Sequence, residues 1–110
     1  MNNLKLNQMK KDIFTKTLNK VCKECGISKK DIFSKSKKQE TADSRHLLYY
    51  VCLETPHFKI SYLQRYMKDH GYKAYHSEII YGYNKIKNQI EIDEDIKSKI
   101  GHLQAECINS

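Results

Sequence analysis

The sequence predicts an all-α protein that forms a single domain of about six helices. Apolar residues recur at the 3.6-residue spacing of a helix along most of the chain, and almost nowhere at the two-residue spacing of a strand. Four glycines and one proline are too few for the turn-rich all-β classes. The length of 110 residues is that of one domain, so residues 1–110 are treated as a single unit.

The first third of the chain is expected to hold two helices and a loop. The first helix runs from about Leu6 to Glu24, with its apolar residues on one stripe, and Gly26 is placed to end it in a left-handed conformation. A short helix follows, with Ser28 as its N-cap and Asp31 in its first turn. Residues 34–39 contain three lysines and no apolar residue, which predicts a basic loop.

Two helices are expected in the middle of the chain. The third helix runs from about Ala42 to Thr55 and is stopped by Pro56. The fourth is shorter, from about Ile60 to Asp69, and the pair Ser61 and Gln64 has the spacing of a capping box at its start.

The fifth helix is expected from about Tyr75 to Ile90, after a turn that contains Gly71. Its predicted core face consists of Ile79, Ile80, Tyr83, Ile86 and Ile90. Its outer face carries hydrogen-bonding side chains with little net charge, at Ser77, Tyr81, Asn84, Lys85 and Asn88. Asp93 is expected to cap a last helix from Glu94 to Glu106.

A short helix, a glycine-containing turn and a longer helix, together spanning about Ile60 to Ile90, form the pattern of a helix-turn-helix. On that interpretation the outer face of the longer helix suits base edges in a major groove. An ordinary solvated helix face has the same composition, so both interpretations stay open.

The net charge of +7 is unevenly distributed along the chain. Residues 1–45 hold 12 basic and 5 acidic residues, residues 46–88 hold 6 and 3, and residues 89–110 hold 2 and 5. A basic body with an acidic end favours a polyanionic partner. Lysine supplies 18 of the 20 basic residues, and the bias of an AT-rich coding sequence would also produce that excess.

The cysteines do not form a complete metal site in the sequence. Cys22 and Cys25 make one CxxC pair, whereas zinc takes four ligands and usually two such pairs. We expect no cofactor and no metal, and interpret the pair as partly buried residues of a helix, with a half zinc site or a redox pair as the alternative. Unpaired cysteines agree with a reducing compartment.

The sequence also argues against enzyme and membrane classes. It has no Gly-rich phosphate loop, no HExxH motif and no recognisable catalytic triad, so no enzymatic activity is expected. No apolar run approaches the ~18 residues of a membrane helix, and the N-terminus lacks a signal-peptide pattern. We therefore expect a cytoplasmic protein with no membrane partner.

Several segments are shared with one known family, namely Val21–Ile27, Asp31–Lys35, Ser44–His46, Glu54, His76–Ile86 and Asp95–Leu103. In this order they resemble the C-terminal DNA-binding domain of the bacterial replication initiator DnaA, over about residues 13–103. The resemblance implies an all-α fold with a Trp-repressor-like helix-turn-helix. The ATPase module of an initiator is missing, so the resemblance implies DNA binding and not initiation itself.

The resemblance also implies a set of DNA-binding residues. Lys37 or Lys38 of the loop would reach a minor groove, and Arg45 would hold a phosphate. His76 and Ser77 match the family's residues that touch bases or backbone in the major groove. Beyond the resemblance, we expect the fifth helix to enter the major groove through Tyr75, His76, Ser77, Glu78 and Tyr81. Lys35 is expected to hold the DNA backbone with the rest of the loop, and Lys73 and Lys85 are further candidate contacts. Ala74 and Tyr75 replace the family's Arg-Asp, and Glu78 replaces a hydroxyl residue.

The function expected from these observations is double-stranded DNA binding with sequence preference, in the regulation of replication or transcription. Composition is compatible with a phage or mobile element that has an AT-rich genome, and thus with the cytoplasm of a bacterial host. The main alternative is a protein-interaction module that keeps the fold and binds a second copy of itself or a replication or transcription factor. RNA binding is a third possibility.

Overall fold

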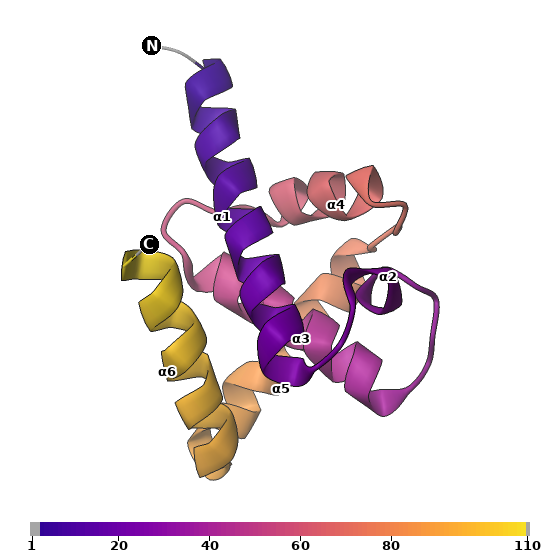
Figure 1. The fold of residues 1–110 in the computed structure, drawn as a ribbon, viewed down its shortest axis with the longest axis vertical. Helices are drawn as coiled ribbons and strands as arrows, with labels where there is room; N and C mark the ends of the chain where they lie inside the picture. The colour runs from indigo at the N-terminus through magenta and orange to yellow at the C-terminus, as the bar shows by residue number, and fades with distance from the viewer. Residues whose placement is uncertain (1–2, 110) are drawn as a thin grey trace.

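The computed structural model describes the backbone of residues 3–109 and the side chains of residues 8–105. Within these limits the chain is helical throughout and has no strand, which confirms the all-α prediction. Six helices follow one another (Figure 1): α1 (Asn3–Cys25), α2 (Lys29–Ile32), α3 (Gln39–Glu54), α4 (Ile60–Asp69), α5 (His76–Ile92) and α6 (Glu94–Asn109).

Most of the predicted helix ends are confirmed. Gly26 follows α1 with a φ of 64°, and Gly71 follows α4 with a φ of 83°, both in the left-handed region that glycine tolerates best. The Ser28 side chain accepts a hydrogen bond from the Asp31 amide, and Asp93 Oδ1 accepts from the amides of residues 95 and 96 at the start of α6.

The predictions for the starts of α3 and α4 differ from the structure. Helix α3 starts at Gln39, three residues before the predicted Ala42, so the basic loop is shorter than expected. The capping box at Ser61 and Gln64 does not form, because Lys59 occupies the N-cap without a side-chain hydrogen bond. Gln64 Nε2 instead donates to the Ala74 carbonyl over 3.2 Å, which ties α4 to the segment that leads into α5.

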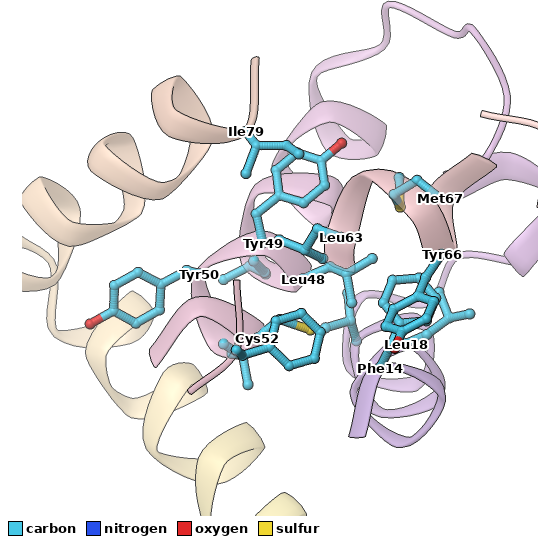
Figure 2. Packing of buried hydrophobic residues seen from close by; sticks show 14 of the residues in the cluster. Phe14, Leu18, Leu48, Tyr49, Tyr50, Cys52, Leu63, Tyr66, Met67 and Ile79 are labelled. Atoms are coloured by element: carbon cyan, nitrogen blue, oxygen red, sulfur yellow. The ribbon is translucent and has the colours of Figure 1, made fainter. Parts of the chain in front are cut away.

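Helix α3 is the central element of the fold. It contacts each of the other five helices, and its residues from Ser44 to Cys52 are all buried. The core around it receives Phe14 and Leu18 from α1, Leu63, Tyr66 and Met67 from α4, Ile79 and Ile86 from α5, and Ile100 and Leu103 from α6. Figure 2 shows Phe14 and Leu18 beside Tyr66, and Ile79 beside the ring of Tyr49. The buried positions of one helix therefore organise the whole domain.

Helices α3 and α5 cross closely because Gly82 has no side chain. A Cβ built at Gly82 would lie 2.5 Å from His46 Cδ2 and 3.2 Å from Tyr49 Cδ2, both in α3. The glycine is thus needed for a close approach between two helices and not for a turn.

Cys22 and Cys25 lie on α1 and are half-buried, as predicted for helical residues of this kind, and both are free thiols. The side chain of Cys107 lies outside the described ones. Among the described residues, no helix is long and apolar enough to cross a membrane.

The close crossing predicts opposite effects for two Gly→Ala substitutions. Gly82→Ala forces the added methyl group into the buried His46 ring, and overpacking of this kind costs about 1–3 kcal/mol. Gly101→Ala in α6 meets no atom within 4 Å, so the higher helix propensity of alanine stabilises by up to ~1 kcal/mol. Thermal denaturation of both variants measures the difference. Equal melting temperatures would show that α5 does not depend on Gly82 for its approach to α3.

Candidate nucleic-acid interface

The loop between α2 and α3 alternates inward serines with outward lysines. Ser34 and Ser36 are half-buried, whereas the lysines between and after them, Lys35, Lys37 and Lys38, are exposed. Ser34 Oγ accepts from the Ser36 amide over 3.3 Å, and Ser36 Oγ accepts from the Lys38 amide over 3.2 Å. Because the serines bond to the backbone of the loop itself, three positive charges are displayed on a short, internally bonded segment.

Arg45, which was predicted to hold a phosphate, is buried and hydrogen-bonded within the protein. Arg45 is only 6% exposed, and its guanidinium is turned toward the loop from inside the protein. Nη1 donates to the carbonyl oxygens of Ile32 and Ser34 over 2.9 and 3.1 Å, and Nη2 donates to that of Ser36 over 3.2 Å. Arg45 therefore holds the loop from beneath, and the charges offered to solvent there belong to the lysines.

Glu78, which was predicted to contact a base, also has hydrogen-bond partners within the protein. The carboxylate is half-buried and accepts a 2.6 Å hydrogen bond from the Tyr72 hydroxyl, with the Tyr49 hydroxyl at 3.5 Å. Burial, together with the hydrogen bond to Glu78, raises the pKa of Tyr72 to about 12, so its hydroxyl stays a donor at neutral pH. Burial raises the pKa of Tyr49 further still, with the Glu78 charge adding to the effect. The negative charge of Glu78 is turned into the protein, away from the outer face of α5.

The remaining residues at the start of α5 form an exposed face. Tyr75, the N-cap residue, and Tyr81 are 58% and 62% exposed, and His76 and Ser77 between them are exposed as well. The exposed Lys73 holds its ammonium 5.2 Å from the centre of the Tyr75 ring, a cation–π contact. These side chains offer hydrogen-bonding groups, aromatic surface and one cation, with no carboxylate among them.

Two further predictions on α5 differ from the structure. Ile80, expected in the core, is 37% exposed, because it lies one residue off the stripe formed by the buried Ile79 and Ile86. Lys85 is half-buried, and its Nζ lies 3.9 Å from Asp43 Oδ1 of α3. The charge of Lys85 is thus partly matched within the protein, which makes it a weaker candidate for phosphate than the loop lysines.

Sequence reasoning missed three residues at this site. Tyr49 and Tyr72 were not among the predicted site residues, yet both hydroxyls reach Glu78. His46 is buried with 8% exposure, meets the exposed Tyr81 ring edge-on at 5.7 Å, and has an Nδ1 without a hydrogen-bond partner in the described part of the chain. The charge of Glu78 was the one available signal, because a carboxylate on a half-buried face requires donors nearby.

Other possible sites offer less chemistry. A surface pocket of about 400 Å³ lies between the C-terminal end of α1 and the first halves of α3 and α6. Its lining mixes charges of both signs, including Glu24, Asp43, Lys38 and Lys99. Among the described side chains, no three His, Cys, Asp or Glu residues are grouped closely enough to hold a metal ion. The loop and the exposed face of α5 are therefore the surface with the most distinctive composition.

Comparisons of the chain with protein-family models, with curated proteins and with solved structures found no match.

The buried His46 predicts a pH dependence of stability. Burial lowers its pKa below the ordinary value of 6.5, and the nearby charge of Lys85 lowers it further. Asp43 and Glu78 act in the opposite direction, and Arg45 lowers the pKa again. At a pH just below 6.5 the unfolded chain binds a proton at His46 that the folded protein does not bind. The contribution of His46 to the free energy of unfolding is therefore complete above about pH 6.5 and decreases as the pH falls below that value.

Urea denaturation between pH 7.5 and pH 5 measures this effect. His46→Gln should flatten the decrease, whereas His102→Gln, at a side chain that is 77% exposed, should leave it in place. A decrease of the same slope in the His46→Gln variant would assign the pH dependence to other groups.

Proposed function

We propose that the protein binds double-stranded DNA through the α4–α5 pair used as a helix-turn-helix, with the basic loop as a second contact. The observation that carries the proposal is the internal position of Arg45 and Glu78. Arg45 holds the loop by its carbonyls with the lysines outward, and Glu78 is turned inward from the first turn of α5. Both exposed surfaces are thereby left without a carboxylate among the residues proposed to contact DNA.

The loop would supply affinity for DNA, and the start of α5 would supply sequence preference. Lys35, Lys37 and Lys38 would neutralise phosphates and release counterions, which supplies affinity for any sequence. His76 and Ser77 would hydrogen-bond to base edges, and the Tyr75 and Tyr81 rings would make apolar contacts with groups such as the thymine methyl. This division agrees with the resemblance to the DnaA C-terminal domain, with Arg45 and Glu78 reassigned to internal roles.

Regulation of replication or transcription is the role we propose for such a binder, in the cytoplasm of a bacterium or of a phage-infected host. In this proposal the domain acts by occupying a DNA site.

A protein-interaction module is the second candidate, and one observation favours it. Tyr75, Ile80 and Tyr81 are all large and exposed within two turns of one helix, and exposed apolar side chains gathered in this way also mark protein interfaces. Such an interface would bind a partner with little dependence on salt, whereas DNA binding through the lysine loop weakens steeply with salt.

Fluorescence anisotropy with a randomised DNA duplex at two salt concentrations, followed by sequencing of the retained fraction, tests the proposal. We expect salt-sensitive binding and an enriched motif. His76→Ala should lose the motif at a cost of about 1–3 kcal/mol, as for a lost base contact. Lys37→Ala should weaken all sequences about equally and reduce the salt slope by about 1.

Lys97→Ala is the matched control, because it removes one exposed lysine from α6, outside the proposed surface. Its affinity and salt slope should equal those of the wild type. The absence of duplex binding even at low salt would rule out the proposal, and competition by RNA stronger than by duplex DNA would favour an RNA ligand.

A further inference from the structure

The loop and the start of α5 are separated in sequence by about forty residues, and one series of side-chain contacts connects them. Arg45 of α3 lies in the middle of the series. It donates hydrogen bonds to the backbone of the loop on one side and holds its guanidinium 4.9 Å from the centre of the Tyr72 ring on the other. The Tyr72 hydroxyl in turn donates to Glu78 in the first turn of α5.

At the loop end, the contact fixes the path of the backbone. A guanidinium only donates hydrogen bonds, and its fork is planar and rigid. Its bonds to the carbonyl oxygens of Ile32, Ser34 and Ser36 therefore set where alternate residues of the loop lie. The lysines that follow each of these serines point outward as a consequence.

At the helix end, the contact fixes the rotation of α5. Successive residues of a helix are rotated by about 100°, so a fixed Glu78 places the neighbouring Ser77 about 100° around the helix, where it is exposed. The 2.6 Å bond to Tyr72 joins a carboxylate to a hydroxyl, a pairing that is shorter and stronger than one between neutral groups. Gln64 adds a second tie by donating to Ala74, between Tyr72 and the helix.

We infer that Arg45, Tyr72 and Glu78 are positioning residues that hold the lysine loop and the first turn of α5 as one rigid, two-part binding surface. The inference rests on the proposed DNA binding. A surface whose two parts are fixed relative to each other loses less freedom on binding, so both contacts form together. Without the series of contacts, loop and helix would bind as separate, weaker elements.

Tyr72→Phe and Tyr83→Phe are a matched pair of variants for testing this inference. Each removes one hydroxyl that donates to a glutamate, Glu78 in the first case and Glu54 in the second. Glu54 is the last residue of α3, whereas the loop precedes the first, so the Tyr83 contact lies at the other end of that helix. A change confined to Tyr72→Phe is therefore a property of the contact series and not of losing a hydroxyl.

The first measurement uses the free protein. Amide resonances of residues 34–38 should shift in Tyr72→Phe, and the Ser36 and Lys38 amides, which are bonded to loop serines, should exchange with solvent several-fold faster. Tyr83→Phe should leave these amides unchanged. Glu78→Gln keeps an acceptor for the tyrosine and should give a smaller change in the same direction, which provides a second variant if Tyr72→Phe is poorly folded.

The second measurement is a double-mutant cycle in duplex binding. Tyr72→Phe should weaken binding by roughly tenfold, the size expected when a charge-assisted hydrogen bond that organises the surface is lost. Lys37→Ala should then cost several-fold less in the Tyr72→Phe background than in the wild type, because the loop is no longer aligned with the helix. In the Tyr83→Phe background the cost should be unchanged. A residue with a merely structural role would lower stability without changing this coupling.

The outcomes separate the two proposals. If the wild type binds no duplex, the proposed function fails, and unchanged loop amides in Tyr72→Phe would overturn the positioning inference independently. If the wild type binds and the two tyrosine variants behave alike, the inference is wrong while the function stands. Altered loop amides with a full cost of Lys37→Ala in the Tyr72→Phe background would also overturn it, because the contact would then shape the loop without aligning it for DNA.

Discussion

The burial of α3 on almost every side is the constraint on which the rest of the structure depends. Its C-terminal part is apolar and forms the centre of the core, but its N-terminal part buries Ser44, Arg45 and His46. Buried polar groups are costly unless they are hydrogen-bonded, so the elements around Arg45 must supply partners for its guanidinium. Helix α2 and the loop supply carbonyl oxygens to Arg45, so their position against α3 follows from that requirement.

The same constraint explains why the candidate surface lies where it does. A buried arginine satisfied by carbonyl oxygens keeps a positive charge inside the protein, and the inward Glu78 offsets it across the Tyr72 ring. Buried charges of opposite sign add little net stability, and their value lies in fixing one arrangement of the groups they join. Here those groups belong to the lysine loop and to α5. The internal polar contacts therefore determine how the exposed side chains of the loop and of α5 are placed.

Helix positions and most helix ends followed from the sequence, because apolar periodicity and capping residues such as Ser28, Asp93 and Gly26 act locally. The interior of the candidate site did not. Arg45 bonds to carbonyl oxygens 9 to 13 residues away and lies against Tyr72, 27 residues away, and a single sequence carries no information on such pairings. Gly82 shows the same limit, since its role is set by His46, 36 residues earlier.

The inward turn of Glu78 changes the electrostatic argument for DNA. A carboxylate on the outer face of α5 would repel phosphate. If Glu78 pointed outward, it would therefore favour a protein partner over DNA. With that carboxylate held by tyrosine hydroxyls, the exposed face consists of Tyr75, His76, Ser77 and Tyr81 beside the cation of Lys73. Exposed aromatic surface alone is compatible with either partner. Three loop lysines held in place from beneath by a buried arginine are not needed for an apolar protein contact, and they are what a phosphate backbone requires. The balance of the surface therefore favours DNA.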